Sequence, residues 1–306
     1  IAQTHHLKQA QAASNTPEEL AKLPVLSLND INPKAEPYPL EEKLESGIKV
    51  LFHPQFTNEI AYVDLYFDST AVSQQQLPYL YLLAELLGKV NTDKHNYLQL
   101  ATELKDKTGG VSFGAYAYPR SNSKEVYYPK FKVSAKALME NLPQMLDLTN
   151  EIINSSDFSD QQRLKELLQK IKAQRQAELL NNPTGLAAGR ILAYMSPAAA
   201  YSEMGNLSFY EFIAELEQSL PDKGPEISKN LADVAKKVFN KNNLLVGVVM
   251  PSKDYPKFQQ NFAKLVNHIS AQPSTRNVYE FELEPRNEGI LTAGKVQYVA
   301  KAYNYR

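Results

Sequence analysis

The chain has 306 residues, 43% of them hydrophobic and 22% charged, which is ordinary for a globular protein. Its 33 basic and 34 acidic residues give a net charge of -1, so the charge balance predicts neither nucleic acid nor an anionic membrane as a partner. It has no cysteine, which excludes disulfides, thiolate zinc sites and a cysteine nucleophile, and no apolar run of membrane-spanning length.

The two ends read as interrupted elements. Residues 1–14 favour a helix and start with Ile rather than Met, and residues 296–306 stop within a strand-like alternation. We therefore expect a piece of a longer polypeptide. The absence of cysteine and of a signal peptide predicts a cytoplasmic location, with an organellar matrix as the alternative.

After the first helix, Thr16 is the expected N-cap of a short helical turn that starts at Pro17. The prolines between Pro24 and Pro39 then predict an extended linker laid over a surface. Two paired strands follow, at Ile48–His53 and Glu59–Phe67.

The next stretch predicts two helices and a hairpin. Leu77 to about Val90 is apolar almost all the way round, which is typical of a buried helix. A second helix, about Lys94–Thr108, is expected to end at Gly109 and Gly110 with a left-handed cap. Alternating apolar residues then predict paired strands at Val111–Tyr118 and Val126–Ser134.

The remainder is mainly helical. The apolar run Leu244–Met250 predicts a central strand buried on both faces. A boundary is expected near residues 272–277, followed by strands of another module at Tyr279–Leu283 and Gly294–Tyr303. Together the elements predict an α+β fold, with a largely antiparallel sheet and helices packed on one face. The expected helices are Lys136–Asn154, Ser159–Leu180, Thr184–Met195, Ser208–Leu220, Ser228–Asn240 and Tyr255–Ser270.

The residues do not form a recognisable active site. None of the five histidines lies in an H-E-x-x-H or H-x-x-E-H motif, and all are interpreted as surface or cap residues. Asp64 and Asp68 are expected on an exposed sheet edge or face rather than in an active site. A group of tyrosines could either line a peptide-contacting surface or pack within the sheet, and packing is the favoured interpretation. These are Tyr116, Tyr118, Tyr127 and Tyr128.

Several stretches, in this order, resemble the presequence-protease branch of the pitrilysin/insulinase zinc metallopeptidases. They are PEELAKLPVLSLNDINP, IKVLFHPQFTNEIAYVDLYFDS, LPYLYLLAELLG, LKDKTGGVSFGAYAY and YSEMGNLSFYEFIAELE. The resemblance implies two similar halves joined by a helical hairpin, each with two homologous α+β domains, that close around a chamber for unfolded peptides. It implies that residues 1–23 end the hairpin, 24–272 form the third, inactive domain, and 273–306 form a linker and the first strands of a truncated fourth domain.

The resemblance also implies the absence of the zinc site from this chain. The family's motif H-x-x-E-H, on the first buried helix of the catalytic half, falls on Tyr79, Leu82 and Leu83 here. A leucine can neither bind zinc nor activate its water. No catalytic or metal-binding residue is therefore assigned in this chain, and the family's substrate-contacting Arg and Tyr are expected beyond Arg306.

Two functions remain. In the first, the chain belongs to a zinc metalloendopeptidase that degrades unfolded peptides, zinc is held by the N-terminal catalytic half of the same polypeptide, and this half forms a chamber wall. In the second, it is a non-catalytic scaffold or binding module of the same superfamily. The sequence preceding Ile1 would decide between them.

Overall fold

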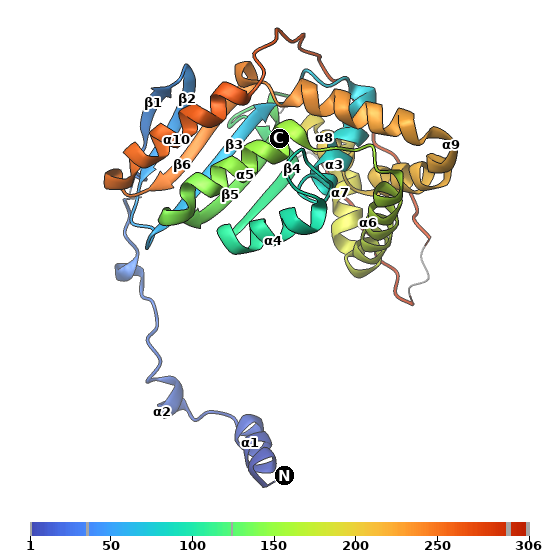
Figure 1. The fold of residues 1–306 in the computed structure, drawn as a ribbon. Coiled ribbons are helices and arrows are strands. Elements are labelled where there is room, and N and C mark those ends of the chain that lie inside the picture. Colours follow the sequence, from blue (N-terminus) through green and yellow to red (C-terminus); the bar gives the residue numbers. More distant parts are fainter. Residues whose placement is uncertain (1, 35–36, 124, 292–294, 304–306) are drawn as a thin grey trace. The chain divides into compact units, whose positions relative to one another are not determined.

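The computed structural model describes residues 2–34, 37–123, 125–291 and 295–303. The chain forms two compact units, Ile1–Tyr38 and Pro39–Arg306, which are considered separately. Figure 1 shows the elements of both.

The first unit is organised by local interactions. It contains α1 (Ala2–Ala12), α2 (Pro17–Leu20) and the 3-10 turn η1 (Leu28–Asp30). The predicted cap is confirmed: the Thr16 backbone N–H donates to Glu19 Oε2 at 2.8 Å, and the Glu19 N–H donates to Thr16 Oγ1 at 3.2 Å. The predicted linker between Pro24 and Pro39 includes η1, and its residues 35–36 lie outside the described residues. Every described residue of this unit is exposed.

The second unit is built on a six-stranded sheet in the order β1-β2-β6-β3-β5-β4. Only β2 and β6 pair in parallel, and the other neighbours are antiparallel, as the predicted fold class requires. The strands are β1 (Glu41–Glu45), β2 (Ile48–Pro54), β3 (Ile60–Asp68), β4 (Gly110–Pro119), β5 (Tyr127–Leu138) and β6 (Leu244–Met250).

Strand β1 was not predicted because EEKLE is mostly charged. A tight turn creates it: Ser46 and Gly47 have φ of 51° and 81°, the left-handed values of a two-residue hairpin loop that matches strand twist. On the helix side, Glu45 Oε1 accepts a hydrogen bond from the Tyr255 hydroxyl at 2.9 Å. Long-range pairing therefore decides the structure of this segment.

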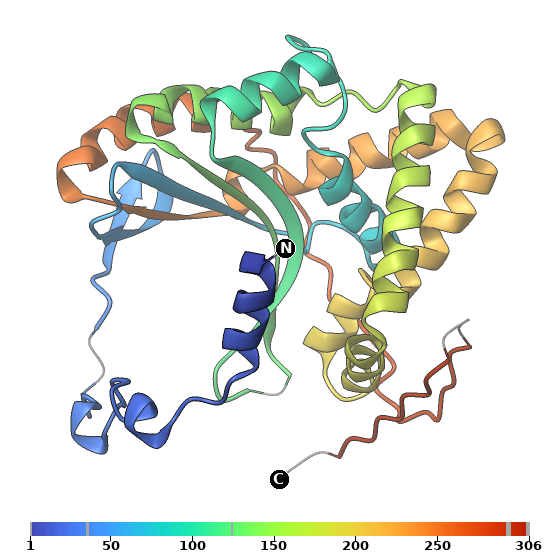
Figure 2. The same ribbon diagram turned by 90° about the horizontal axis from the view of Figure 1, so that it is seen from below.

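The helices that cover the sheet lie on one of its faces. Figure 2 shows α4, α5 and α10 on the same side of the sheet, and α3 packs against both β4 and α9. The helices are α3 (Leu77–Leu86), α4 (Tyr97–Lys107), α5 (Leu142–Ser155), α6 (Gln161–Asn181), α7 (Pro183–Ala193), α8 (Pro197–Glu203), α9 (Leu207–Val238) and α10 (Tyr255–His268).

Three helical predictions need correction. Helix α5 begins at Leu142 rather than Lys136, because Lys136–Leu138 continue the pairing of β5 with β3. Helix α8 was not predicted. The two helices expected on either side of Pro221 and Pro225 form one helix, α9. A proline inside a helix costs about 3 kcal/mol, and the long buried face of α9, from Phe209 to Val238, offsets that cost.

The predicted left-handed cap at Gly109 and Gly110 is confirmed only in part, because Gly110 has a positive φ of 127° but the C-cap of the helix is Thr108. Helix α4 ends at Lys107, and the backbone of its C-cap residue Thr108 is extended with φ of -132°. The Gly109 N–H donates to the carbonyl of Lys136 at 2.7 Å. The backbone at Gly109 therefore lies as close to β5 as a paired strand does. A Cβ on Gly109 would lie 3.1 Å from the Lys136 side chain, and this close approach explains the glycine there.

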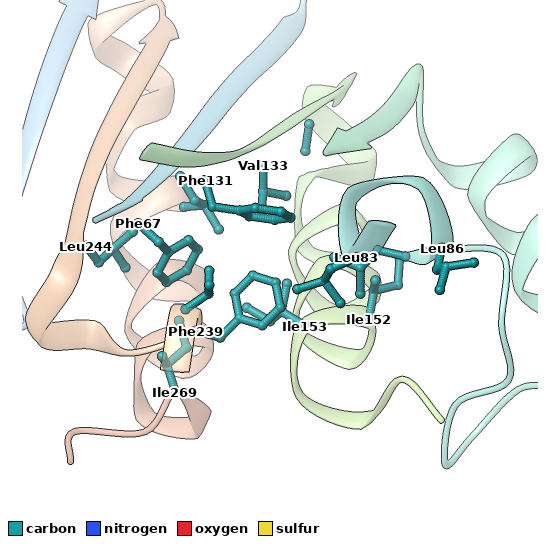
Figure 3. Packing of buried hydrophobic residues seen from close by; sticks show 14 of the residues in the cluster. Phe67, Leu83, Leu86, Phe131, Val133, Ile152, Ile153, Phe239, Leu244 and Ile269 are labelled. Carbon is teal, nitrogen blue, oxygen red and sulfur yellow. The ribbon is translucent and has the colours of Figure 1, made fainter. Parts of the chain in front are cut away.

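The core lies between the sheet and the helices. In Figure 3, Phe67 and Phe131 of the sheet meet Phe239, and Leu83 and Ile152 extend the same cluster. The expectation that β6 is buried on both faces is wrong. Leu244, Val246, Val248 and Met250 are buried, whereas the residues between them are only partly buried. They face the side of the sheet opposite the helices.

Residues 271–291 and 295–303 have no regular secondary structure, so the strand predicted at 279–283 is wrong. The backbone of Glu280 bonds instead to the Gln74 side chain, at 2.9 Å through its N–H and 2.7 Å through its carbonyl. Gly294, the start of the other predicted strand, lies outside the described residues, and 295–303 are irregular. The boundary near 272–277 stays a prediction.

Candidate functional site

The positions at which the resemblance would place zinc ligands lie on helix α3. Leu82 and Leu83 are fully buried in the apolar core. Tyr79 is partly buried: its ring packs edge-on against Phe212 with centroids 5.0 Å apart, and its hydroxyl accepts a hydrogen bond from Asn230 Nδ2 at 3.3 Å. Burial raises the pKa of Tyr79, which opposes the phenolate form. Two apolar side chains and a neutral phenol do not fit a zinc ion.

The histidines of the second unit have structural partners. His53 Nδ1 lies 3.0 Å from the Pro39 carbonyl, and His95 Nδ1 lies 2.8 Å from Glu151 Oε1. His268 Nδ1 lies 2.8 Å from the Lys264 carbonyl. Across the described ranges, no three His, Asp or Glu side chains gather as a metal site would require. Nothing in the part of the chain described thus suggests a metal centre.

The sheet face opposite the helices carries the most distinctive set of side chains, and we call it the open face. Alternate residues of a strand point the same way. The open face therefore carries Tyr62, Asp64 and Tyr66 of β3. It also carries Tyr128, Lys130 and Lys132 of β5. Asp64 and Asp68 therefore lie on a sheet face, one of the two predicted locations, and β3 is an interior strand rather than an edge.

The interpretation that favoured sheet packing is confirmed in part, because the Tyr118 ring packs on the open face with its centroid 6.0 Å from that of Tyr66 and 6.1 Å from that of Tyr116. Tyr116, Tyr118 and Tyr128 are 48%, 39% and 47% exposed on the open face. Only Tyr127 turns inward, where its ring centroid lies 6.1 Å from that of Tyr201. Three of the four rings are thus partly exposed on the open face.

Four charges near the middle of the open face form two ion pairs. Lys132 Nζ lies 2.9 Å from Asp64 and Lys130 Nζ lies 3.1 Å from Asp68. The Tyr66 hydroxyl donates to Asp64 Oδ2 at 3.0 Å, and burial together with this carboxylate raises the pKa of Tyr66 to about 12. Burial alone would raise the pKa of Asp68, but hydrogen bonds from Thr70 and the charge of Lys130 lower it overall. The face is therefore nearly neutral.

A cavity of about 560 Å³ opens in the middle of this face. Leu51 of β2 and Leu245 and Val249 of β6 form its apolar floor, and Gly247 leaves the floor without a side chain. Four tyrosines stand around it: Tyr62, Tyr66, Tyr118 and Tyr128. The sequence offered one signal for this site, a glycine inside an apolar strand, which often marks a close approach of another group.

A second group of tyrosines, around Tyr201, is structural. The Tyr201 hydroxyl lies 3.0 Å from Ser69 Oγ, and the Tyr279 hydroxyl donates to the carbonyls of Ser69 and Val72, at 2.9 Å each. Burial raises the pKa of both phenols, which keeps them neutral. This cluster holds the segment after α10 against the sheet domain.

Comparison with solved structures identifies the fold. A crystal structure of a peptidase M16 inactive domain from Pseudomonas fluorescens superposes with a TM-score of 0.55 at 16% identity, covering 79% of this chain and 54% of that one. The family model for the region associated with subfamily C of the M16 peptidases matches residues 1–216. The chain belongs to this family.

Two curated relatives match 98% of the chain. "Protein HypA" of Clostridium perfringens is 33% identical over 301 residues, and "Presequence protease 1, chloroplastic/mitochondrial" of Arabidopsis thaliana is 31% identical over 307. The matches cover 31% and 28% of those proteins, so the chain spans about a third of their length. The predicted resemblance to the presequence-protease branch, in its C-terminal half, is confirmed.

Proposed function

We propose that this chain is part of the non-catalytic half of a zinc metalloendopeptidase that degrades unfolded peptides, and that its open face forms a wall of the peptide chamber. The relatives named presequence proteases support a peptidase as the parent protein. The chamber wall is inferred from the open face itself. This face is a nearly neutral, tyrosine-rich surface with an apolar cavity, and the other face of the same sheet is covered by helices.

Catalysis is assigned to the rest of the polypeptide. Leu82 and Leu83 are buried where the family's ligands would lie, so zinc would be held by the N-terminal half. Bound there, zinc would supply a Lewis acid and an activated water. The assignment of residues 1–23 to a hairpin, 24–272 to a third domain and 273–306 to the start of a fourth belongs to the same proposal.

The first unit supports a partner within the same polypeptide. Val25, Leu26, Leu28 and Ile31 are all exposed within a few residues of one another. Contiguous exposed apolar side chains mark an interaction site. We assign this stretch to contact with the N-terminal half.

Photocrosslinking in the full-length polypeptide tests the chamber wall. A benzophenone amino acid replaces Tyr118 on the open face or, as the control, Leu98, which is 64% exposed on helix α4. We expect an unfolded peptide to crosslink at position 118 and not at 98. Crosslinking only at 98, or at neither position, would reject the open face as the wall.

The scaffold function and the cellular location have their own readouts. A parent that lacks H-x-x-E-H upstream and hydrolyses no peptide would establish the scaffold.

In the described part of the chain, no helix combines the length and apolarity needed to cross a bilayer. The predicted cytoplasmic location stays a prediction, and the names of the Arabidopsis thaliana and Danio rerio relatives are consistent with its alternative, an organellar matrix.

A further inference from the structure

Gly247 contributes no side chain to the lining of the cavity on the open face. Gly247 occupies the centre of β6, opposite Leu51 on β2 and Asp64 on β3. Its neighbours on the same face, Leu245 and Val249, project on either side of it. The cavity of about 560 Å³ lies over this position and falls in the size range of ligand pockets.

The lining favours an uncharged, apolar group. The floor is aliphatic, and Tyr66 and Tyr118 stand beside it with ring centroids 6.0 Å apart. The nearest charges, on Asp64 and Lys130, already pair with Lys132 and Asp68. His53 also lines the cavity, and its Nδ1 lies 3.0 Å from the Pro39 carbonyl. A charged ligand group would lose its hydration without gaining a free partner, whereas an apolar one gains from burial.

We propose that this cavity, the Gly247 subsite, binds one aliphatic or aromatic side chain of an extended peptide and thereby sets a sequence preference of the peptidase. The inference rests on the proposed chamber wall. Tyrosines suit such a contact because they offer large, stiff surfaces that remain compatible with water at their hydroxyls.

The substitution Gly247→Val is a selective probe of this subsite. A Cβ at this position would lie 3.5 Å from Tyr66 Cε2 and 3.7 Å from Asp64 Cβ, both ordinary contacts. Valine also favours strands, so the variant is expected to fold and to occupy the floor of the cavity at this position. Ser134→Val is the matched control: Ser134 lies on the same face, opposite Asp64, but does not line the cavity.

The experiment measures the cleavage of unstructured Gly/Ser-rich peptides by the full-length polypeptide. The peptides are matched pairs that differ only in carrying Phe or Ala at one position, and each pair tests a different position. Wild type is expected to prefer Phe at one position by about tenfold to a hundredfold in kcat/KM, the gain from burying such a side chain. Gly247→Val is expected to abolish that preference, and Ser134→Val to retain it. An unchanged preference in a folded Gly247→Val variant would overturn the subsite.

A second measurement uses the 306-residue chain, which has no cysteine. Alkylation of Gly247→Cys is expected to slow when the Phe peptide is added and not when the Ala peptide is added. Slow alkylation without peptide would show that the chain itself fills the cavity. Alkylation that slows as the protein concentration rises would show that a second copy of the chain covers the cavity. Either result overturns the proposal. Crosslinking at position 118 without a Gly247 effect would reject the subsite but keep the chamber wall.

Discussion

Individual side chains of the sheet domain differ in function according to the face they occupy. Leu83 is fully buried among core residues, whereas Tyr118 on the open face is 39% exposed. Substitutions on the helix side should therefore act on stability, and substitutions on the open face should act on binding.

Leu83→Ala is expected to lower the free energy of unfolding by about 2–5 kcal/mol, because it deletes a buried side chain and leaves a cavity. Urea denaturation followed by circular dichroism measures the change. Leu98→Ala is the control, since Leu98 is 64% exposed, and its effect should stay within about 0.5 kcal/mol. Equal effects of the two substitutions would place Leu83 outside the core.

Tyr279 should make the domain sensitive to high pH. Burial, reinforced by neighbouring phenols and Asp68, raises the pKa of Tyr279 above its ordinary value. Its contribution to stability is fully present below the unfolded-state pKa of about 10 and is lost as the pH rises towards the folded-state value. Tyr279→Phe cannot ionise, so it should flatten part of the stability loss between about pH 10 and pH 11.

The measurement for Tyr279→Phe is a series of urea unfolding curves from pH 7 to 11. At pH 7 the variant should lose about 1 kcal/mol, since the hydroxyl donates to the carbonyls of Ser69 and Val72. Parallel pH profiles for wild type and variant would contradict a buried, neutral phenol.

At the scale of elements, helix α4 depends on its N-cap. Asn96 Oδ1 accepts from the backbone N–H groups of Leu98 and Gln99, at 3.0 and 2.9 Å, and Gln99 Oε1 accepts from the Asn96 N–H at 3.1 Å. These contacts satisfy donors that the first helical turn leaves free. The start of α4 is therefore encoded locally.

Asn96→Ala is expected to cost about 0.5–2 kcal/mol, whereas Asn96→Asp should cost little because aspartate caps equally well. Thermal unfolding compares the two, and hydrogen exchange at Leu98 and Gln99 shows whether the loss is local. An alanine variant as stable as the aspartate variant would mean that tertiary contacts alone set the helix start.

For the molecule as a whole, the expected property is the lack of independent catalysis. The 306-residue chain should retain no stoichiometric zinc after treatment with a chelator and should hydrolyse no peptide, because Tyr79, Leu82 and Leu83 cannot form the site. Elemental analysis and a peptidase assay measure both. One tightly held zinc per chain would refute the assignment.

A triple variant tests whether the zinc motif can be restored on α3. Tyr79→His, Leu82→Glu and Leu83→His together would restore the motif, but they would place polar groups in the apolar core. We expect loss of stability rather than zinc binding. Tight zinc binding with unchanged stability would show that α3 can open to a chamber.

The sequence by itself determined those features that depend on near neighbours. Alternation defined β3 and β5, apolar residues on all sides marked α3 as buried, and Thr16 followed by Pro17 indicated a capped turn. The order of its motifs also identified the family, which the comparisons confirm.

Tertiary structure decided the remaining features. β1 exists because β2 pairs with it, α9 continues through two prolines because its apolar face is buried, and β6 inserts between β2 and β3 from far along the chain. Whether Tyr118 packs or faces a ligand depends on which face the helices cover. Periodicity shows that a strand has two faces, but only the packing of distant elements determines which face remains open.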